Sequence, residues 1–421
     1  MITELSAQNF KSWKDTGKLQ IAPLTGFFGA NSSGKTSILQ TLLMLKQTVE
    51  RPPNWNGIID FGDMDSLVNL GSFDDLIHQH KRDIPLKISL SWKFSEKLSI
   101  VDMDEVDILS FELSLFDNEN SVPGVSFNYN IGEKNLAVDS NGQDVLLISV
   151  PVELKSHDES LFRCYGLRSA HYHNQEVFSS LQIRFENLFR SIRYLGPLRD
   201  YPRQNYTWQG KHSPGVGKHG EDMVTALFSG RIQLLSIEEQ IPKWLQQLDL
   251  IDSYRLNPAL DTETDYEFLV RKYKGGPEVR LTDVGFGVSQ VLPVLVLCYY
   301  VPEGSILILE QPEAHLHPKV QSELADLLIE VVKNRQLQII LESHSEHLIL
   351  RLMRRIAEEQ ISADDTAFYF CEMNEGVSEI ERLNVDDYGN ITNWPQNFFG
   401  DQMGDLAAKT KAEMRRKKAS K

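Results

Sequence analysis

The sequence of 421 residues is poor in cysteine and in basic charge. Its three cysteines, Cys164, Cys298 and Cys371, lie far apart and form no Cys-x-x-Cys pair, so neither a disulfide framework nor a zinc ribbon is indicated. Its 43 Lys and Arg face 59 Asp and Glu, which gives a formal net charge of −16. This balance argues against a protein that coats nucleic acid or anionic membrane by bulk attraction, so any DNA contact must be local.

Targeting signals and long apolar runs are also lacking. The N-terminus shows neither the basic nor the apolar region of a secretory signal. The most apolar stretch, 291–301, contains Pro293 and is shorter than a bilayer span. We therefore expect a cytoplasmic protein without membrane contact, and the length with 41% hydrophobic residues predicts two or three structural units.

The spacing of apolar residues predicts an α/β unit at the start of the chain. Extended runs at 2–10 and 19–28 lead into a Gly/Ser loop, and an apolar helix pattern begins at Ser37. From 85 to 152 apolar and polar residues alternate, as in the run LKISLSW. This alternation predicts an antiparallel sheet inserted into the α/β unit.

The second half of the chain returns to the α/β pattern. Residues 175–255 have a mostly helical pattern that a Pro/Gly-rich loop interrupts. A hairpin around Gly275 then precedes a helix from about Val288, and strand patterns follow at 306–309 and 337–341.

A complete phosphate-loop pattern, GxxxxGK[ST], lies at 29–36 between a predicted strand and a predicted helix. Its glycines let the backbone curl so that N–H groups face phosphate oxygens, and the helix start adds positive potential. Lys35 would reach the β- and γ-phosphates of ATP, and the Thr36 hydroxyl would bind Mg²⁺. The predicted ATP-binding residues of this loop are Gly29, Asn31, Ser32, Ser33, Gly34, Lys35, Thr36 and Ser37.

An apolar strand pattern at 306–309 ends in the acidic run Glu310, Gln311, Pro312 and Glu313. A buried parallel strand places its last residue at the carboxyl edge of the sheet, where nucleotide sites form. Glu310 is therefore predicted to bind Mg²⁺ together with Thr36.

The order of four landmarks resembles that of the ABC-type ATPases of the RecF/SMC/OLD superfamily. The landmarks are the phosphate loop, LTDVGFGVSQVLP at 281–293, ILEQPEAHLHP at 308–318 and ESHSE at 342–346. YLGPLR at 194–199 and DYGNITNWP at 387–395 also resemble a bacterial subgroup of AAA family ATPases. The resemblance is specific over 1–50 and 275–350 and weak over 51–190.

This resemblance implies an α/β fold, namely an ABC-type P-loop NTPase head with an inserted antiparallel β subdomain and a helical arm. The implied segments are a first part of the head (1–50), a β-rich insertion (51–175), a helical arm (176–274), a second part of the head (275–380) and a C-terminal extension with a basic tail (381–421).

The resemblance also implies roles for individual residues. Glu310 stands at the Walker B acid and His344 at the switch histidine, while 285–290 and 314–318 stand at the signature and the D-loop. Proteins of this type bind two ATP molecules between two head-to-tail copies, so ATP occupancy and dimerisation are linked. A homodimer with ATP and Mg²⁺ is therefore expected.

Two departures from the family pattern bear on the chemistry. Gln311 replaces the glutamate that polarises the attacking water, and an amide cannot take a proton. Hydrolysis is expected to be slow, with Glu313 as a substitute base or Gln311 orienting the water. The signature lacks its usual serine, so Gly287, Ser289 or the N–H groups of the helix start would meet the γ-phosphate. The predicted catalytic residues are Glu310, Gln311, Glu313 and His344.

Other residues allow more than one interpretation. A metal site of His315, His317, His344 and His347 lacks a completing carboxylate or thiolate. Arg199 and Arg203 could contact phosphates or brace their Gly/Pro-rich loop. Lys11 and Trp13 could approach the nucleotide, although packing explains Trp13 equally well.

The expected function is that of a switch subunit in a bacterial multi-protein system, plausibly anti-phage defence, with a separate nuclease or toxin as effector. OLD relatives carry a Toprim nuclease domain, for which the stretch after His344 is too short. The alternatives are a RecF-like DNA repair ATPase and an ATP-held scaffold with little hydrolysis. The basic run at 409–418 could dock DNA or an acidic partner, or be a solvated end.

Overall fold

The computed structural model describes most of the chain. The described residues are 1–98, 105–118, 123–132, 134–140, 145–149, 160–168, 175–210, 212–233, 236–259, 264–395, 398 and 409–413. Part of the expected C-terminal extension, including 414–418 of the basic run, therefore lies outside the described residues.

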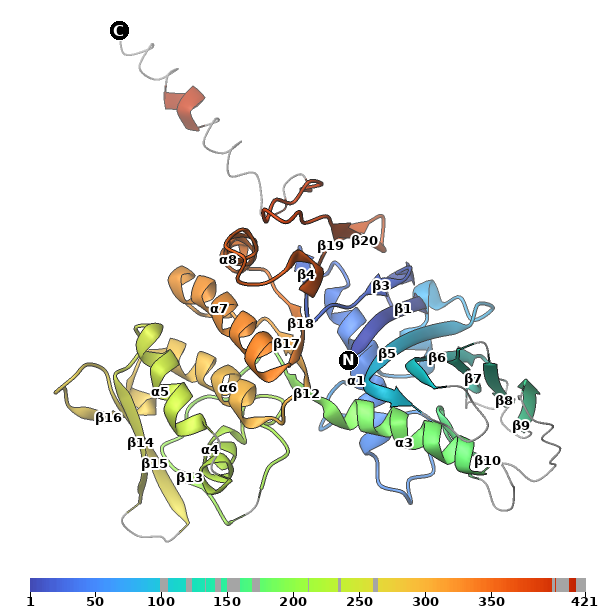
Figure 1. Ribbon diagram of the computed structural model, residues 1–421, viewed down its shortest axis with the longest axis horizontal. Helices are drawn as coiled ribbons and strands as arrows, with labels where there is room; N and C mark the ends of the chain where they lie inside the picture. Colours follow the sequence, from blue (N-terminus) through green and yellow to red (C-terminus); the bar gives the residue numbers. More distant parts are fainter. Residues whose placement is uncertain are drawn as a thin grey trace.

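A six-stranded sheet in the order β12-β17-β18-β4-β19-β20 forms the centre of the molecule (Figure 1). The strands are β12 (Ile192–Leu195), β17 (Ile306–Glu310), β18 (Gln338–Glu342), β4 (Leu24–Gly29), β19 (Thr366–Asn374) and β20 (Val377–Leu383). All neighbours pair in parallel except β20, which is antiparallel to β19. The carboxyl ends of β12, β17, β18 and β4 therefore lie along one edge.

Helices cover both faces of this sheet, and its strands are therefore buried on both sides. Leu307 and Leu309 of β17 belong to the apolar core of one face, whereas Ile306 and Ile308 belong to the core of the other. The first face carries α6 (Phe286–Tyr300), α7 (Pro318–Arg335) and α8 (Glu346–Ala357). The second face carries α1 (Lys35–Glu50) and α3 (Gln175–Ser191). The α/β architecture expected from the sequence is confirmed.

A second, antiparallel sheet lies beyond α1 and α3 (Figure 1). Its order is β2-β1-β5-β6-β7-β8-β9, with β3 paired to β1. Its strands are β1 (Ile2–Phe10), β2 (Trp13–Asp15), β3 (Leu19–Gln20), β5 (Leu86–Leu98), β6 (Val106–Phe116), β7 (Gly124–Ile131), β8 (Lys134–Ser140) and β9 (Val145–Ser149). The predicted antiparallel sheet is confirmed, and it extends a sheet that the N-terminal strands begin.

The segment expected as a helical arm contains helices that pack against the head. Helices α4 (Met223–Ile232) and α5 (Ile237–Gln247) share one apolar core with α6. Beside them is a small sheet of β13 (Tyr206–Thr207), β14 (Ser253–Pro258), β15 (Asp265–Arg271) and β16 (Glu278–Arg280). The same segment also supplies β12 to the central sheet. Strands β15 and β16 pair antiparallel on either side of Gly275, where the sequence predicts a hairpin, whereas β12, β13 and β14 were not expected between the helices.

The remaining short elements are α2 (Phe73–Leu76), β10 (Ser160–Arg163), β11 (Gly166–Arg168) and the 3₁₀ turns His78–His80, Leu281–Asp283 and Ala363–Asp365. Near the C-terminus, the Phe398 ring lies 4.9 Å from that of Phe370 and 6.2 Å from that of Phe28, measured between centroids. No described helix is long and apolar enough to cross a membrane.

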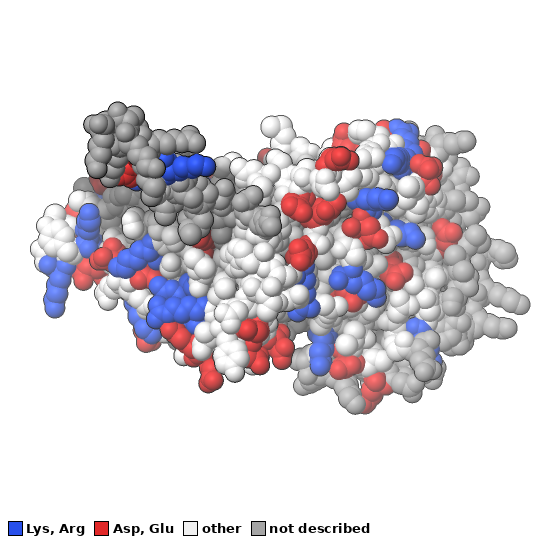
Figure 2. All heavy atoms as spheres, turned by 90° about the horizontal axis from the view of Figure 1, so that it is seen from above, with Lys and Arg blue, Asp and Glu red and all other residues white. Residues whose placement is uncertain are grey.

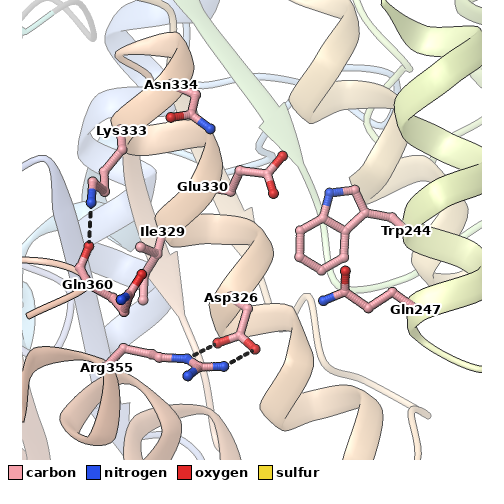
Figure 3. A pocket seen from close by; sticks show the side chains of 9 residues that line it. All are labelled: Trp244, Gln247, Asp326, Ile329, Glu330, Lys333, Asn334, Arg355 and Gln360. Atoms are coloured by element: carbon pink, nitrogen blue, oxygen red, sulfur yellow. Dashed lines mark hydrogen bonds and ion pairs between the residues drawn. The ribbon is translucent and has the colours of Figure 1, made fainter. Parts of the chain in front are cut away.

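A pocket of about 500 Å³ lies between α5 and α7, as Figure 3 shows. Its polar side chains are largely engaged with each other or with nearby backbone. Arg355 Nε donates to Asp326 Oδ1 at 2.7 Å, and Lys333 Nζ donates to the Gln360 carbonyl at 2.9 Å. Asp326 also accepts from Arg351, which ties α7 to α8. These contacts make the pocket wall a structural brace between helices.

Candidate nucleotide-binding site

The phosphate loop connects β4 to α1 and depends on glycine at both ends. Gly29 has φ 134°, and a Cβ there would lie 2.0 Å from the Cys371 carbonyl oxygen of neighbouring β19. Gly34 has φ 89° and caps α1 in the left-handed conformation. Asn31 and Ser32 are exposed, whereas Ser33 is fully buried. The chain therefore curls tightly over the start of α1, as the pattern predicts.

The Lys35 side chain is held inside this loop. Its Nζ donates to the carbonyls of Ala30 at 2.6 Å and Gly29 at 3.2 Å, and to Ser33 Oγ at 3.2 Å. Burial lowers the pKa of Lys35, and the charge of Glu342 opposes that shift. Oxygen atoms of the phosphate loop thus hold the Lys35 ammonium group inside the curl of that loop, where it is expected to meet phosphate. Ser37 follows on the first turn of α1, with its N–H bonded to the Gly34 carbonyl at 3.0 Å.

Trp13 supports the loop from beneath. Its indole Nε1 donates to the Gly34 carbonyl at 3.0 Å, and the ring is fully buried. The Ser378 hydroxyl of β20 donates to Ser12 Oγ at 2.7 Å. A Cβ at Gly34 would come within 3 Å of all three of these side chains. Trp13 therefore combines core packing with direct support of the phosphate loop.

Two carboxylates lie side by side at the carboxyl ends of β17 and β18. Glu310 pairs in register with Glu342, and Glu342 Oε2 accepts the Thr36 hydroxyl at 2.7 Å. Burial, followed by the charge of Glu342, raises the pKa of Glu310 to about 7. A hydroxyl and two carboxylates supply hard oxygen ligands of the kind that Mg²⁺ binds. The predicted side chains, Thr36 and Glu310, carry oxygen atoms that suit Mg²⁺. Glu342 provides a third oxygen ligand that was not predicted from the sequence.

Glu313 and His344 lie next to this pair. Glu313 Oε1 accepts from the Ser343 hydroxyl at 2.7 Å and from the His344 backbone N–H at 2.8 Å. Burial raises the pKa of Glu313, and its Oε2 has no partner among the described residues. His344 Nε2 lies 3.9 Å from Glu342 Oε1. Burial and then the Lys35 charge lower the pKa of His344, so its imidazole is uncharged near neutral pH.

Gln311 adopts a turn that few non-glycine residues adopt. Its φ is 45°, and its N–H donates to the Glu342 carbonyl at 2.9 Å. The turn follows directly after Glu310 and lets the chain fold back so that Glu313 reaches the end of β18. The position expected to hold a catalytic glutamate is therefore well fixed in the backbone but carries an amide.

A family model described as an AAA ATPase domain matches residues 1–186 and 224–349, which is more than half of the chain. The chain belongs to the AAA ATPase domain family. This match includes the phosphate loop, the acidic end of β17 and the His344 segment. A second model, described as a protein of unknown function (DUF3696), matches residues 361–408. A comparison with curated proteins finds no match.

The chain is also similar to solved SMC head domains. An SMC head bound to the C-winged helix domain of ScpA is 14% identical with a TM-score of 0.48, over 91% of this chain and 98% of that chain. The SMC head domain from Thermotoga maritima is 14% identical with a TM-score of 0.41, over 91% and 99%. An SMC head from Pyrococcus furiosus, bound to the C-terminal domain of ScpA, is 13% identical with a TM-score of 0.46, over 98% and 99%.

Tyr194 and Arg199 border the carboxylates of this ATPase domain. Of these two, only Arg199 was considered from the sequence, as a residue that contacts phosphates or braces its loop. The Tyr194 hydroxyl donates to Glu310 Oε1 at 3.1 Å. Arg199 is 8% exposed, and its charge interacts with Tyr194, Glu310 and Glu313. The feature of the sequence that could have located these residues is the YLGPLR run at 194–199, which begins with the last two residues of β12.

The signature segment of the ATPase domain forms the start of α6. Gly285 and Phe286 are exposed, whereas Ser289 is buried and donates its hydroxyl to the Phe286 carbonyl at 2.8 Å. Gly287 is half-buried beside Leu250 and Leu316. The Ser289 hydroxyl is thus engaged within the helix, and Gly285 and Phe286 are the exposed residues of the segment.

The histidines of the D-loop have structural partners. The His315 ring lies 5.5 Å from the Phe286 ring, and His317 Nδ1 accepts the Lys319 backbone N–H at the start of α7. Within the described ranges, no group of three or more His, Cys, Asp and Glu residues could hold a metal ion by itself. A Mg²⁺ site would therefore need the Thr36 hydroxyl and phosphate oxygens in addition to the carboxylates.

Proposed function

We propose that the chain is a Mg²⁺-dependent ATPase that hydrolyses ATP slowly and closes head to tail with a second copy around the nucleotide. One observation carries this proposal: Lys35 Nζ, the Thr36–Glu342 hydrogen bond and Glu310 meet where the phosphate loop faces the carboxyl ends of β17 and β18. This cluster provides a cation for phosphate and oxygen donors for a metal ion within one small volume.

The residues divide the work of binding and proton transfer. Lys35 and the N–H groups of the phosphate loop hold the phosphates, and Thr36, Glu310 and Glu342 would hold Mg²⁺, which neutralises charge on the phosphate oxygens. Glu313 has a raised pKa, and its buried Oε2 has no hydrogen-bond partner among the described residues, which suits a general base. The uncharged His344 imidazole can donate a hydrogen bond to a phosphate oxygen without releasing a proton.

The start of α6 supports the head-to-tail dimer. Among the described residues, a Cβ at Gly285 would meet nothing within 4 Å, and one at Gly287 would meet only Leu250 and Leu316 at 4.0 Å. Packing within the described part of the chain therefore requires neither glycine. Small residues at an exposed helix start leave room for the phosphates of a nucleotide that the other copy holds.

The proposed biological role is that of a cytoplasmic, nucleotide-gated switch subunit in anti-phage defence, whose effector is a separate protein such as a nuclease or a toxin. This part of the proposal rests on the resemblance to the RecF/SMC/OLD superfamily. A change in dimer state with ATP occupancy is the physical means by which such a subunit would signal.

A second candidate is a scaffold that binds ATP with little hydrolysis and holds its partner inactive. Gln311 favours it, because the amide lies in a rigid turn at the position of the usual base. A RecF-like role on DNA stays a prediction. The described residues on the face shown in Figure 2 do not favour it, because Lys and Arg lie interspersed with Asp and Glu there.

The test is steady-state ATP hydrolysis by the purified chain, with and without double-stranded DNA, against the Lys35→Ala variant as background. Turnover that Lys35→Ala abolishes supports the ATPase. A severalfold rise with DNA would favour the DNA-repair alternative. ATP binding without turnover above the Lys35→Ala background would rule out intrinsic hydrolysis and favour the scaffold.

A further inference from the structure

Arg199 is a buried cation whose charge lacks a full set of partners. It is 8% exposed, and its Nε and Nη1 have no hydrogen-bond partner among the described residues. An unpaired guanidinium in a buried position is costly unless an anion completes it. Burial lowers the pKa of Arg199 to about 10, and the nearby Tyr194, Glu310 and Glu313 oppose that shift.

The position of Arg199 follows from strand pairing. Leu195, the last residue of β12, pairs in parallel with Leu309 of β17, so the loop after β12 leaves the sheet at the same edge as Glu310. Tyr194 connects this loop to Glu310 by a hydrogen bond of 3.1 Å. The loop that carries Arg199 thus begins on the side of β17 opposite β18, and the charge of Arg199 interacts with Glu310 and Glu313.

The loop does not need Arg199 as a brace. The Gly196 N–H donates to the Lys218 carbonyl and the Asp200 N–H to the His219 carbonyl, each at 2.8 Å. His219 Nδ1 lies 2.8 Å from the Leu198 carbonyl oxygen. Backbone and histidine contacts therefore fix the loop on both sides of Arg199, while its Nε and Nη1 remain unpaired.

We infer that Arg199 binds the γ-phosphate of ATP from within the same chain and makes the site discriminate ATP from ADP. This inference rests on the proposed ATPase function and adds a substrate-binding residue to it. Guanidinium groups bind phosphate oxygens through two parallel N–H bonds, and ADP lacks the phosphate that Arg199 would reach. Lys35, in contrast, contacts the β-phosphate as well and serves both nucleotides.

The neighbouring Arg203 provides a matched control. It belongs to the same loop, but its side chain is 58% exposed and its Nη2 donates to Asp200 at 2.7 Å. If only the charge of the loop mattered, removing Arg199 or Arg203 would weaken nucleotide binding equally. A direct contact with the γ-phosphate predicts a loss only when Arg199 is removed.

The test is calorimetric titration of the full chain with Mg²⁺ and either ADP or the non-hydrolysable β,γ-imido analogue of ATP. Arg199→Ala is expected to weaken binding of the analogue by about 10- to 100-fold, the range for a charge-assisted hydrogen bond, and to change ADP binding less than about twofold. Arg199→Lys keeps the positive charge but lacks the planar guanidinium, so its affinity for the analogue should lie between those of the wild type and Arg199→Ala. Arg203→Ala should bind both nucleotides like the wild type.

Equal loss of analogue and ADP binding in Arg199→Ala, or no loss of either, would overturn the inference. If the alanine variant unfolds, judged by its thermal transition, Arg199→Gln replaces it under the same criterion. The proposed function fails separately, when the wild-type chain binds neither nucleotide or when Lys35→Ala binds both as tightly as the wild type.

Discussion

The carboxyl edge of the central sheet and the start of α6 carry the two halves of the proposed ATP site, and they differ in how complete they are. At the sheet edge, Lys35, Thr36 and Glu313 all have hydrogen-bond partners within the chain. At the start of α6, a Cβ at Gly285 would meet no atom of the described residues within 4 Å. The first half is built by this chain alone, whereas the second half is open.

In the proposed dimer, this difference indicates how the site would divide between the copies. A preorganised loop binds phosphate with little reorganisation, so we expect the sheet edge to bind nucleotide in a monomer. The open helix start would gain its contacts only when the second copy brings phosphates to it. Variants at the two places should therefore separate binding from closure.

Gly29→Ala should produce the largest effect. The added methyl group would lie 2.0 Å from the Cys371 carbonyl oxygen at a φ of 134°, so the loop must shift away from β19. We expect nucleotide affinity to fall by about 100-fold or more, because several phosphate contacts move together. Titration with ATP measures this loss. Unchanged affinity would show that the phosphate loop accommodates the methyl group without losing its contacts to phosphate.

Gly285→Asp should break the other half while leaving the first intact. Gly285 has an ordinary φ of −58° and is the N-cap of α6, a position that aspartate stabilises. Its carboxylate would repel phosphates that the other copy presents, so ATP-dependent dimerisation and hydrolysis should drop about tenfold or more. Sedimentation with and without ATP tests this, with ATP binding by the monomer as the internal control. Dimerisation that persists would place the contact elsewhere.

Gln311→Glu should sharpen the comparison by supplying the missing base at the sheet edge. Because the turn at φ 45° is set by the backbone, the substitution should keep the geometry. We expect the rate of hydrolysis to rise about 100-fold, the low end of the contribution of a general base. If single-turnover rates stay unchanged, Glu313 already performs the proton transfer.

Glu310→Gln tests the sheet edge without ligand, through the stability of the nucleotide-free protein. The folded pKa of Glu310, about 7, is above the ordinary 4.5. Its contribution to stability is therefore present below pH 4.5 and is lost as the pH rises through 7. The variant should be more stable than wild type at pH 8 by up to about 3 kcal/mol and nearly equal at pH 4.5.

Thermal unfolding without nucleotide or Mg²⁺, at pH 4.5 and pH 8, measures this difference. Glu267→Gln serves as a control, since Glu267 pairs with Arg280 far along the chain from the sheet edge. An equal difference between wild type and Glu310→Gln at both pH values would show that the buried carboxyl does not titrate as described.

Much of the site was predictable because it rests on contiguous residues. The phosphate loop needs a strand, two glycines and a helix in immediate succession, so its pattern specifies its own geometry. The acidic end of β17 was predictable for a similar reason, since an apolar strand in an α/β pattern ends at the edge where ligands bind. The antiparallel sheet followed from strict alternation of apolar and polar residues.

Glu342, Trp13, Tyr194 and Arg199 could not be placed in the same way. Glu342 reaches Thr36 only because β18 lies between β17 and β4 in the sheet. Tyr194 reaches Glu310 only because β12 pairs beside β17. Each contact joins residues that are distant in sequence, and no local period encodes strand order. Strands β12, β13 and β14 were missed because they are short and lie between stronger helix patterns, whereas the hairpin of β15 and β16 was predicted.

The sequence by itself determined the local chemistry: a phosphate loop, an acidic strand end, an amide in place of the usual base and glycines at the start of a helix. Tertiary structure alone decided which distant side chains complete that chemistry. It placed Glu342 beside Glu310, supported the loop with Trp13 and buried Arg199 next to both acids. The physical reason is that covalent spacing fixes neighbours along the chain, whereas packing of two cores against one sheet fixes neighbours across it.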